Sequence, residues 1–182
     1  MARDIDPREP VPVKVVALVI ALLVGLAFLP RLFAPRNALT GKPAPDFTLA
    51  VLANGETLGN ATQVVLSEQH GKVVLLDFSA SWCPPCRAQA PILEQVASRY
   101  RDQGLVVMGV DTNDEAASGR AWAKAGTFSY PVVYDTGSQT AAAFGVEGLP
   151  TLVLISKDGT VVAVRTGVVG IRELEALVRR QL

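Results

Sequence analysis

Apolar residues occur in two different patterns along the chain. Between Val15 and Leu29 they form one uninterrupted run, which Lys14 precedes and Pro30-Arg31 follows. From residue 46 onward they form shorter runs separated by turn residues. This contrast predicts four segments. They are an N-terminal tail over 1–14, a transmembrane anchor over 15–34, a linker containing Pro and Gly over 35–45, and a folded domain over 46–182.

The N-terminal apolar run is short for a membrane span. As a helix, residues 15–29 reach roughly 22 Å, whereas the hydrocarbon core is roughly 30 Å thick. Residues 32–34 can lengthen the run, and Lys14 and Arg31 can extend their charged ends to the two interfaces. A cleaved secretory signal is the alternative, because its apolar core has a similar length. The segment lacks a convincing small-x-small cleavage site and Pro35 would follow the cut, so the sequence favours an uncleaved anchor.

The centre of the C-terminal part predicts a β-α-β unit. Residues 73–78 form an apolar run without alternation, which is typical of a strand covered on both faces. Apolar residues then recur at helical spacing as far as Tyr100. Gly104 ends this helix before a second strand over 105–110, which we expect to run parallel to the first.

Elements on either side of this unit predict a mixed sheet. Residues 47–51 and those after Asn54-Gly55 are expected to form a hairpin around a tight turn. The remaining predictions are helices over 114–124, 140–144 and 170–182, and strands over 130–134, 151–155 and 161–164, of which the last two form an antiparallel hairpin. The fold class is therefore α/β, with a central mixed β-sheet flanked by helices.

Length and charge restrict the possible classes of function but do not identify one. The 182 residues suffice for one domain with a full core and an appendage. The 17 Lys and Arg residues balance the 17 Asp and Glu residues. Nothing in this balance points to a nucleic-acid partner.

The candidate chemistry lies directly after the predicted central strand. The segment Trp82-Cys83-Pro84-Pro85-Cys86 holds the only two cysteines of the chain. Two thiols separated by two residues at a strand-to-helix turn can close a small disulfide ring. If Cys83 begins the helix, unpaired N–H groups and the helix dipole favour its thiolate, the form that attacks disulfides. The two prolines fit this position, because a first helical turn tolerates Pro.

Other interpretations of the motif fit less well. A structural zinc site needs four Cys or His ligands, and the chain offers only His70 besides the two cysteines. Covalent haem attachment needs His after the second cysteine, where Arg87 stands. An inert disulfide would add little stability, because the loop it closes is short. The motif therefore indicates redox chemistry that needs no cofactor beyond the Cys83–Cys86 pair.

Redox chemistry also suggests the orientation of the anchor, which charge leaves open. Three basic residues precede the apolar run and three follow it. They are Arg3, Arg8 and Lys14 before it, and Arg31, Arg36 and Lys42 after it. Protein disulfides persist in oxidising compartments. We therefore expect a single-pass protein of the cytoplasmic (inner) membrane, with its catalytic domain facing the periplasm or the cell exterior.

Several motifs, in order, resemble those of a known family. They are Gly41-Lys42-Pro43-Ala44-Pro45-Asp46-Phe47, the stretch from Phe78 to Arg87, and Gly148-Leu149-Pro150-Thr151. Over residues 41–182, and with the N-terminal anchor, the chain resembles the membrane-anchored thioredoxins of the TlpA/ResA type. The resemblance implies a thioredoxin-like fold with an N-terminal β-hairpin and a helix–strand insertion over 112–134.

This resemblance implies a thiol-disulfide oxidoreductase that reduces protein disulfides outside the cytoplasm, in cytochrome c maturation or copper-oxidase assembly. Its partners would be disulfide-containing proteins such as apocytochrome c or oxidase assembly factors, and a membrane electron donor of the thiol-transfer type. The residue roles that it implies are an exposed nucleophile at Cys83, a buried resolving thiol at Cys86, a cis-proline at Pro150, substrate-binding backbone at Leu149, and Trp82, Pro84 and Pro85 around the thiols.

Two positions depart from the family pattern. Many relatives carry Glu three residues after the second cysteine, and this chain has Gln89. Conversely, Asp77 matches the buried acid of thioredoxin itself, where this family more often has Asn. We expect burial to raise the pKa of Asp77, so that it accepts or relays the proton of Cys86. The alternative is that backbone donors merely satisfy Asp77 at the end of its strand.

Three rival functions remain. A thiol oxidase or isomerase would use the same pair at a higher reduction potential. A copper metallochaperone would bind metal through the two thiolates, but no His lies beside the motif and only Met1 and Met108 occur. A peroxiredoxin has a related fold, but its reactive cysteine is not expected within Trp-Cys-x-x-Cys.

Overall fold

The chain divides into two units, residues 1–36 and 37–182. The computed structural model describes residues 13–32, 38–126 and 128–182, and side chains of the first helix over 13–25. Most of the predicted tail therefore lies outside the described residues. The same holds for positions 33–34 of the predicted anchor and 35–37 of the predicted linker.

The described part of the first unit is the helix α1 (Val13–Leu32). It overlaps the apolar run in which the sequence predicts a membrane anchor. Among the residues that the structure describes, no helix is long and apolar enough to cross a membrane.

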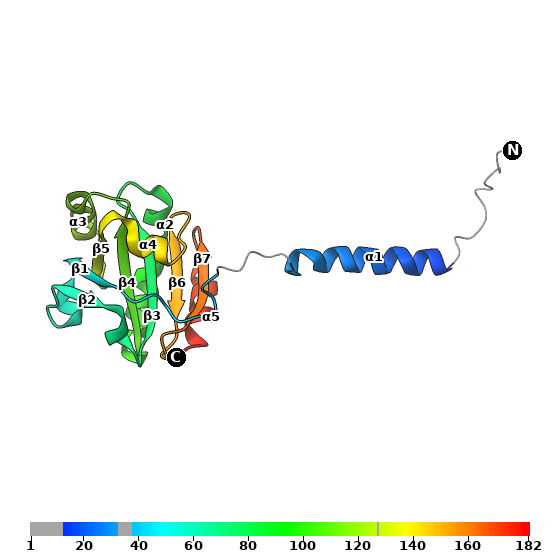
Figure 1. Ribbon diagram of the computed structural model, residues 1–182, viewed down its shortest axis with the longest axis horizontal. Helices are drawn as coiled ribbons and strands as arrows, with labels where there is room; N and C mark the ends of the chain where they lie inside the picture. The colour runs from blue at the N-terminus through cyan, green and yellow to red at the C-terminus, as the bar shows by residue number, and fades with distance from the viewer. Residues whose placement is uncertain (1–12, 33–37, 127) are drawn as a thin grey trace. The chain divides into compact units, whose positions relative to one another are not determined.

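The described strands of the second unit form one seven-stranded sheet in the order β2-β1-β5-β4-β3-β6-β7 (Figure 1). Their bounds are β1 (Thr48–Ala53), β2 (Gln63–Val65), β3 (Val73–Ser79), β4 (Leu105–Thr112), β5 (Val132–Asp135), β6 (Thr151–Ile155) and β7 (Val161–Thr166). Strands β3, β4 and β5 are parallel, and every other neighbouring pair is antiparallel. The predicted mixed sheet is confirmed.

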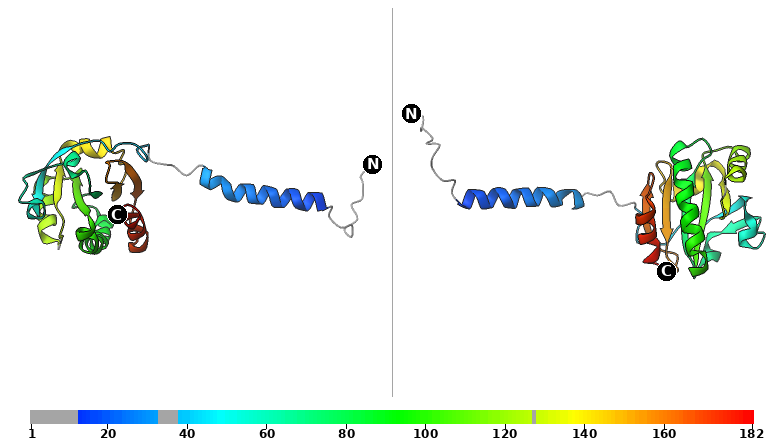
Figure 2. Two further views of the ribbon diagram at one scale, coloured as in Figure 1. Left: turned by 90° about the horizontal axis from the view of Figure 1, so that it is seen from below. Right: turned by 180° about the vertical axis from the view of Figure 1, so that it is seen from behind.

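Helices cover both faces of the sheet (Figures 1 and 2). They are α2 (Pro84–Tyr100), α3 (Ala116–Ala125), α4 (Gln139–Ala143) and α5 (Ile171–Arg179), with 3₁₀ helices η1 (Gly55–Leu58), η2 (Leu66–Gln69), η3 (Arg101–Gln103) and η4 (Thr136–Ser138). Helix α2 lies on one face beside α5, and α4 crosses the opposite face.

Strand β3 shows why its sequence lacks alternation. All of its residues are buried. Val73 and Leu75 pack with Leu93 of α2, while Val74 and Leu76 belong to the cluster on the other face. Both faces of the strand are therefore covered, as the apolar run predicts.

The tight turn predicted at Asn54-Gly55 is wrong. Strands β1 and β2 do pair antiparallel, but residues 54–62 separate them and Gly55 begins η1. The side-chain amide of Asn54 donates hydrogen bonds to the carbonyls of Phe128 and Tyr130 at 2.9 and 3.0 Å. Asn54 thus ties the end of β1 to the segment before β5. This long-range contact outweighs the local preference of the dipeptide for a two-residue turn.

The predicted helix–strand insertion is present as α3 and β5. Strand β5 lies between β1 and β4 in the sheet, so the insertion is part of the core. The ring of Phe128 lies 5.2 Å from that of Trp122, edge-on, and 5.3 Å from that of Tyr130, stacked. These aromatic contacts join α3 to the strand that follows it.

Candidate active site

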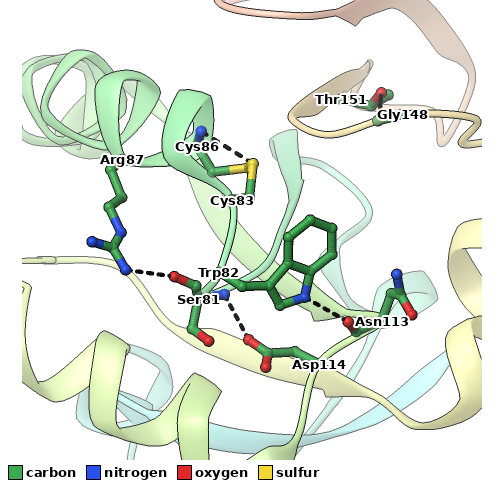
Figure 3. The surroundings of a disulfide bond; sticks show 9 residues. All are labelled: Ser81, Trp82, Cys83, Cys86, Arg87, Asn113, Asp114, Gly148 and Thr151. Atoms are coloured by element: carbon green, nitrogen blue, oxygen red, sulfur yellow. Dashed lines mark hydrogen bonds between the residues drawn. A yellow bond between two sulfur atoms is a disulfide. The ribbon is translucent and has the colours of Figure 1, made fainter.

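The two cysteines lie where β3 ends and α2 begins (Figure 3). Cys83 is the N-cap of α2, and Pro84 and Pro85 occupy its first two positions. The two sulfur atoms form a disulfide with an S–S distance of 2.02 Å. The predicted placement of the pair at a strand-to-helix turn is thus what the structure shows.

The first helical N–H group points at the sulfur of Cys83. Because Pro84 and Pro85 have no N–H group, the first such donor in α2 is that of Cys86. It donates a hydrogen bond to Cys83 Sγ at 3.2 Å. A donor and the positive end of the helix dipole both stabilise negative charge on this atom. The position therefore favours a thiolate at Cys83 when the pair is reduced.

Cys83 is less exposed than the sequence predicts. Its relative exposure is 2%, against 0% for Cys86, so both cysteines of the disulfide are buried. The pair packs with Ala80 and with the partly buried Leu149. The exposure expected of Cys83 is the one that the family resemblance implies, whereas in the structure the disulfide holds Cys83 against Cys86 and Leu149, before β6, packs against the pair. Cys83 is among the residues that line a cleft at the surface.

This cleft brings most of the predicted substrate-binding residues together. Trp82, Cys83, Pro84, Pro85 and Leu149 line it, together with Thr112, Asn113, Ser138, Ala141, Val146, Glu147 and Gly148. Within the described part of the chain, no backbone hydrogen bond involves the N–H or carbonyl group of Leu149. Its peptide groups remain available to an extended peptide bound in the cleft.

Pro150 follows Leu149 through a cis peptide bond. The residue is buried, and its carbonyl accepts a hydrogen bond from the N–H of Gly167 at 2.8 Å. On the other side of the site, the Gln89 side chain pairs with both peptide groups of Val169. Its Oε1 accepts from Val169 N at 2.7 Å, and its Nε2 donates to Val169 O at 3.4 Å. Residues 167–169 therefore connect α2 to the cis-proline segment.

Trp82 stands at the rim of the cleft, with 54% of its surface exposed. Its Nε1 donates a hydrogen bond to the carbonyl of Asn113 at 2.8 Å, as Figure 3 shows. The preceding residue, Ser81, donates its N–H to Asp114 Oδ2 at 2.6 Å and accepts from Arg87 Nη2 at 2.9 Å. The loop before Cys83 is thus held from two sides, by the β4–α3 segment and by α2.

Asp77 lies inside the sheet on the side that α2 covers. Side chains alternate along a strand, so Asp77 shares a face with Val73 and Leu75, which pack against α2. Its exposure is 2%, and Oδ1 has no hydrogen-bond partner among the described residues. Burial raises the pKa of Asp77 to about 7, and the hydrogen bond with Ser79 opposes this shift. The carboxyl group can therefore exchange a proton near neutral pH.

Sequence reasoning missed Asn113 and Asp114, although a signal for them exists. Strands β3 and β4 are parallel, with Ser79 opposite Asp111, so the residues after each strand meet at the same edge of the sheet. The polar run from Asp111 to Asp114 follows β4 as the cysteine motif follows β3. Among the described residues, no group of three or more His, Cys, Asp or Glu side chains is arranged to hold a metal ion.

Comparison with known proteins agrees with this geometry. The AhpC/TSA family matches residues 40–164. The thiol-disulfide oxidoreductase ResA of Halalkalibacterium halodurans is 33% identical over 150 residues, which are 82% of this chain and 81% of the relative. ResA of Bacillus subtilis is 31% identical over 153 residues, 84% of this chain and 82% of the relative.

A solved structure shows the same fold. The crystal structure of a putative thiol:disulfide interchange protein DsbE from Chlorobium tepidum is 33% identical and has a TM-score of 0.67. The match covers 78% of this chain and 94% of that one. The thioredoxin-like α/β fold predicted from the sequence is confirmed, and the chain belongs to the AhpC/TSA family, among the thiol-disulfide oxidoreductases of the ResA type.

Proposed function

We propose that the protein reduces protein disulfides, with Cys83 as the attacking thiol and Cys86 as the resolving thiol. The observation that carries this proposal is the hydrogen bond from the Cys86 N–H group to Cys83 Sγ at the start of α2. It stabilises a thiolate on the one sulfur that borders the cleft. Cys86, with no exposed surface, is positioned to react only with a sulfur already attached to Cys83.

The reaction proceeds by two thiol–disulfide exchanges. In the first, the Cys83 thiolate attacks one sulfur of a substrate disulfide, and the electron pair of the broken S–S bond leaves on the other substrate sulfur. In the second, the Cys86 thiolate attacks Cys83 Sγ, and the remaining substrate sulfur leaves as a thiolate. The substrate gains two electrons and the enzyme is left with the Cys83–Cys86 disulfide. A dithiol electron donor must then reduce this bond.

Asp77 takes the proton that Cys86 loses before the second exchange. A buried thiol holds its proton firmly, because burial disfavours the thiolate. A carboxylate with a pKa near 7 on the α2 side of the sheet is suited to accept that proton and to return it to solvent. Gln89, whose amide is bonded to Val169, has no basic group that could take up this proton.

The setting that we propose is the outer side of the cytoplasmic membrane. The predicted anchor over 15–34 would hold the chain in the membrane, and the catalytic domain would face the periplasm or cell exterior, where disulfide substrates persist. Partners of the proposed reductase would be disulfide-containing proteins such as apocytochrome c or oxidase assembly factors, with a membrane electron donor of the thiol-transfer type.

The reduction potential tests the direction of electron flow. Equilibration of the full chain with glutathione should give a value close to the roughly −270 mV of thioredoxin. A value above about −180 mV, near that of protein disulfide isomerase, would instead support the thiol oxidase or isomerase function. The proposed orientation is tested by adding a protease to intact spheroplasts. Residues 46–182 should be cleaved, whereas their protection by the intact membrane would contradict the orientation.

A further inference from the structure

A second buried carboxyl group lies at the end of β4. Asp111 has no exposed surface, and neither of its carboxyl oxygens has a hydrogen-bond donor among the described residues. It packs against the backbone of α3 at Gly119, where a Cβ atom would lie only 1.8 Å from Asp111 Oδ2. The glycine thus leaves the space that the carboxyl group fills. Such a group is costly to bury unless it is protonated and bonded.

The carboxyl group of Asp114 is a neighbour that can accept a hydrogen bond from protonated Asp111. Asp114 Oδ2 accepts the N–H of Ser81 at 2.6 Å, and Oδ1 accepts the N–H of Glu115 at 2.8 Å. The main-chain carbonyl of Asp114 accepts the hydroxyl of Tyr134 at 3.0 Å. These bonds hold Asp114 between β5 and the loop that precedes Cys83.

The pKa values of the two groups shift in opposite directions. Burial, and then the charge of Asp114, raises the pKa of Asp111 to about 7. Asp114 is less buried, and hydrogen bonds from Ser81 and Glu115 outweigh its desolvation and lower its pKa. The side-chain interaction between the two groups raises the pKa of Asp111 and lowers that of Asp114, which favours one proton on the pair over two neighbouring charges.

We propose that Asp111 and Asp114 form a carboxylic acid–carboxylate pair, in which Asp111 donates a hydrogen bond to Asp114 and Asp114 positions the Ser81–Trp82 segment that carries Cys83. Both are positioning residues, since neither touches the sulfur atoms. Loss of the shared proton places two anions side by side, which weakens the hold of Asp114 on Ser81. The functional consequence rests on the proposed role of Cys83 as the attacking thiol.

Asp111 and Asp77 both have pKa values raised to about 7, so the test must separate these two groups. By strand register, Asp77 of β3 lies on the same face, two residues before Ser79, the partner of Asp111. Tyr134 faces the pair from β5, where its hydroxyl is bonded to Asp114. The nearby guanidinium groups are bonded to main-chain carbonyls, Arg87 of α2 to Ser81 and Arg120 of α3 to Leu52. Among the described residues, no ion pair includes either aspartate of the pair.

The direct test follows the amide of Ser81 by ¹⁵N–¹H NMR of the oxidised full chain. Disulfide-bonded cysteines do not titrate, so the Ser81 resonance should shift with an inflection near pH 7 that reports Asp111. Asp111→Asn keeps a donor for Asp114 and should remove the inflection. Asp77→Asn is the matched control, because it removes the other buried carboxyl group with a pKa near 7 and should leave the inflection in place.

Two results would overturn the proposal: a Ser81 resonance that does not titrate between pH 5 and 9, or an inflection that survives in Asp111→Asn. This readout does not depend on which cysteine attacks the substrate. Failure of the proposed function would therefore appear separately, as disulfide reduction that persists in Cys83→Ser.

Kinetics of the reduced protein provide the functional arm. Asp114→Ala should slow reduction of a small aromatic disulfide about tenfold, because it removes a charged acceptor from Ser81, and Asp114→Asn should restore part of the rate. The rate of Asp111→Asn divided by that of the wild type should rise as pH increases through 7. A ratio that stays flat, with Asp114→Ala as fast as the wild type, would show that the pair has no positioning role.

Discussion

Two β-α junctions meet at one edge of the sheet and serve the same site in different ways. The β3–α2 junction carries the two cysteines, and these residue types by themselves indicate thiol–disulfide chemistry. The β4–α3 junction contributes a main-chain carbonyl at Asn113 and a carboxylate at Asp114, which hold Trp82 and Ser81. Reacting groups need particular side chains, whereas supporting groups can use backbone atoms that any residue supplies.

The largest effects should come from the β3–α2 junction. Cys83→Ser should abolish disulfide reduction, because it removes the attacking sulfur. Cys86→Ser should instead accumulate mixed disulfides with substrate, because nothing then releases Cys83. Insulin reduction and mass spectrometry of trapped adducts measure the two outcomes. Residual activity in Cys83→Ser, or absence of adducts in Cys86→Ser, would contradict these roles.

Asp77→Asn should slow the second exchange by about 100-fold, the lower range for loss of a general base. Formation of the mixed disulfide by Cys83 should suffer less, because its thiolate is stabilised by the N–H of Cys86. Rapid-quench measurement of both steps separates the effects. Unchanged resolution would mean that the Cys86 proton leaves through water or another group.

The two buried aspartates should make stability fall as pH rises. Asp77 and Asp111 have pKa values raised from 3.8 to about 7. Between pH 3.8 and about pH 7 the folded protein retains protons that the unfolded chain has lost. The free energy of unfolding therefore decreases as pH rises and levels off above pH 7. Each group contributes at most about 1.4 kcal/mol per pH unit.

Urea denaturation at pH 4.5, 6 and 7.5 measures this dependence. Asp77→Asn should remove the contribution of one group and leave stability at pH 7.5 level or higher, since it replaces a desolvated acid. An unchanged decline would show that Asp77 does not contribute a raised pKa, and marked destabilisation would show that Asp77 is a structural hydrogen-bond acceptor.

At the β4–α3 junction, Gly119→Ala should destabilise the protein by roughly 1–3 kcal/mol, because the added methyl group meets Asp111 Oδ2. Ser118→Ala, on the exposed side of the same helix, is the matched control and should change stability by less than about 0.5 kcal/mol. Equal stability of the two variants would show that α3 has room to move away from Asp111.

The sequence predicts well those parts of the molecule in which the residue type itself limits the role that the residue can have. The unbroken apolar run of β3, the cysteine pair and the burial of Asp77 belong to this group. Asn54-Gly55 was mispredicted because Asn54 bonds to residues more than seventy positions away, which no local pattern records. Cys83 is buried by Leu149 and the disulfide, contacts that also depend on the finished fold.

The central claim is that the N-terminus of α2 makes Cys83 the reactive thiolate. Iodoacetamide labelling of the reduced protein across pH, with the labelled cysteine identified by mass spectrometry, tests it most directly. The account predicts that Cys83 is labelled first, with an apparent pKa below the roughly 8.5 of a free thiol. Faster labelling of Cys86, or a Cys83 pKa at or above that of a free thiol, would contradict it.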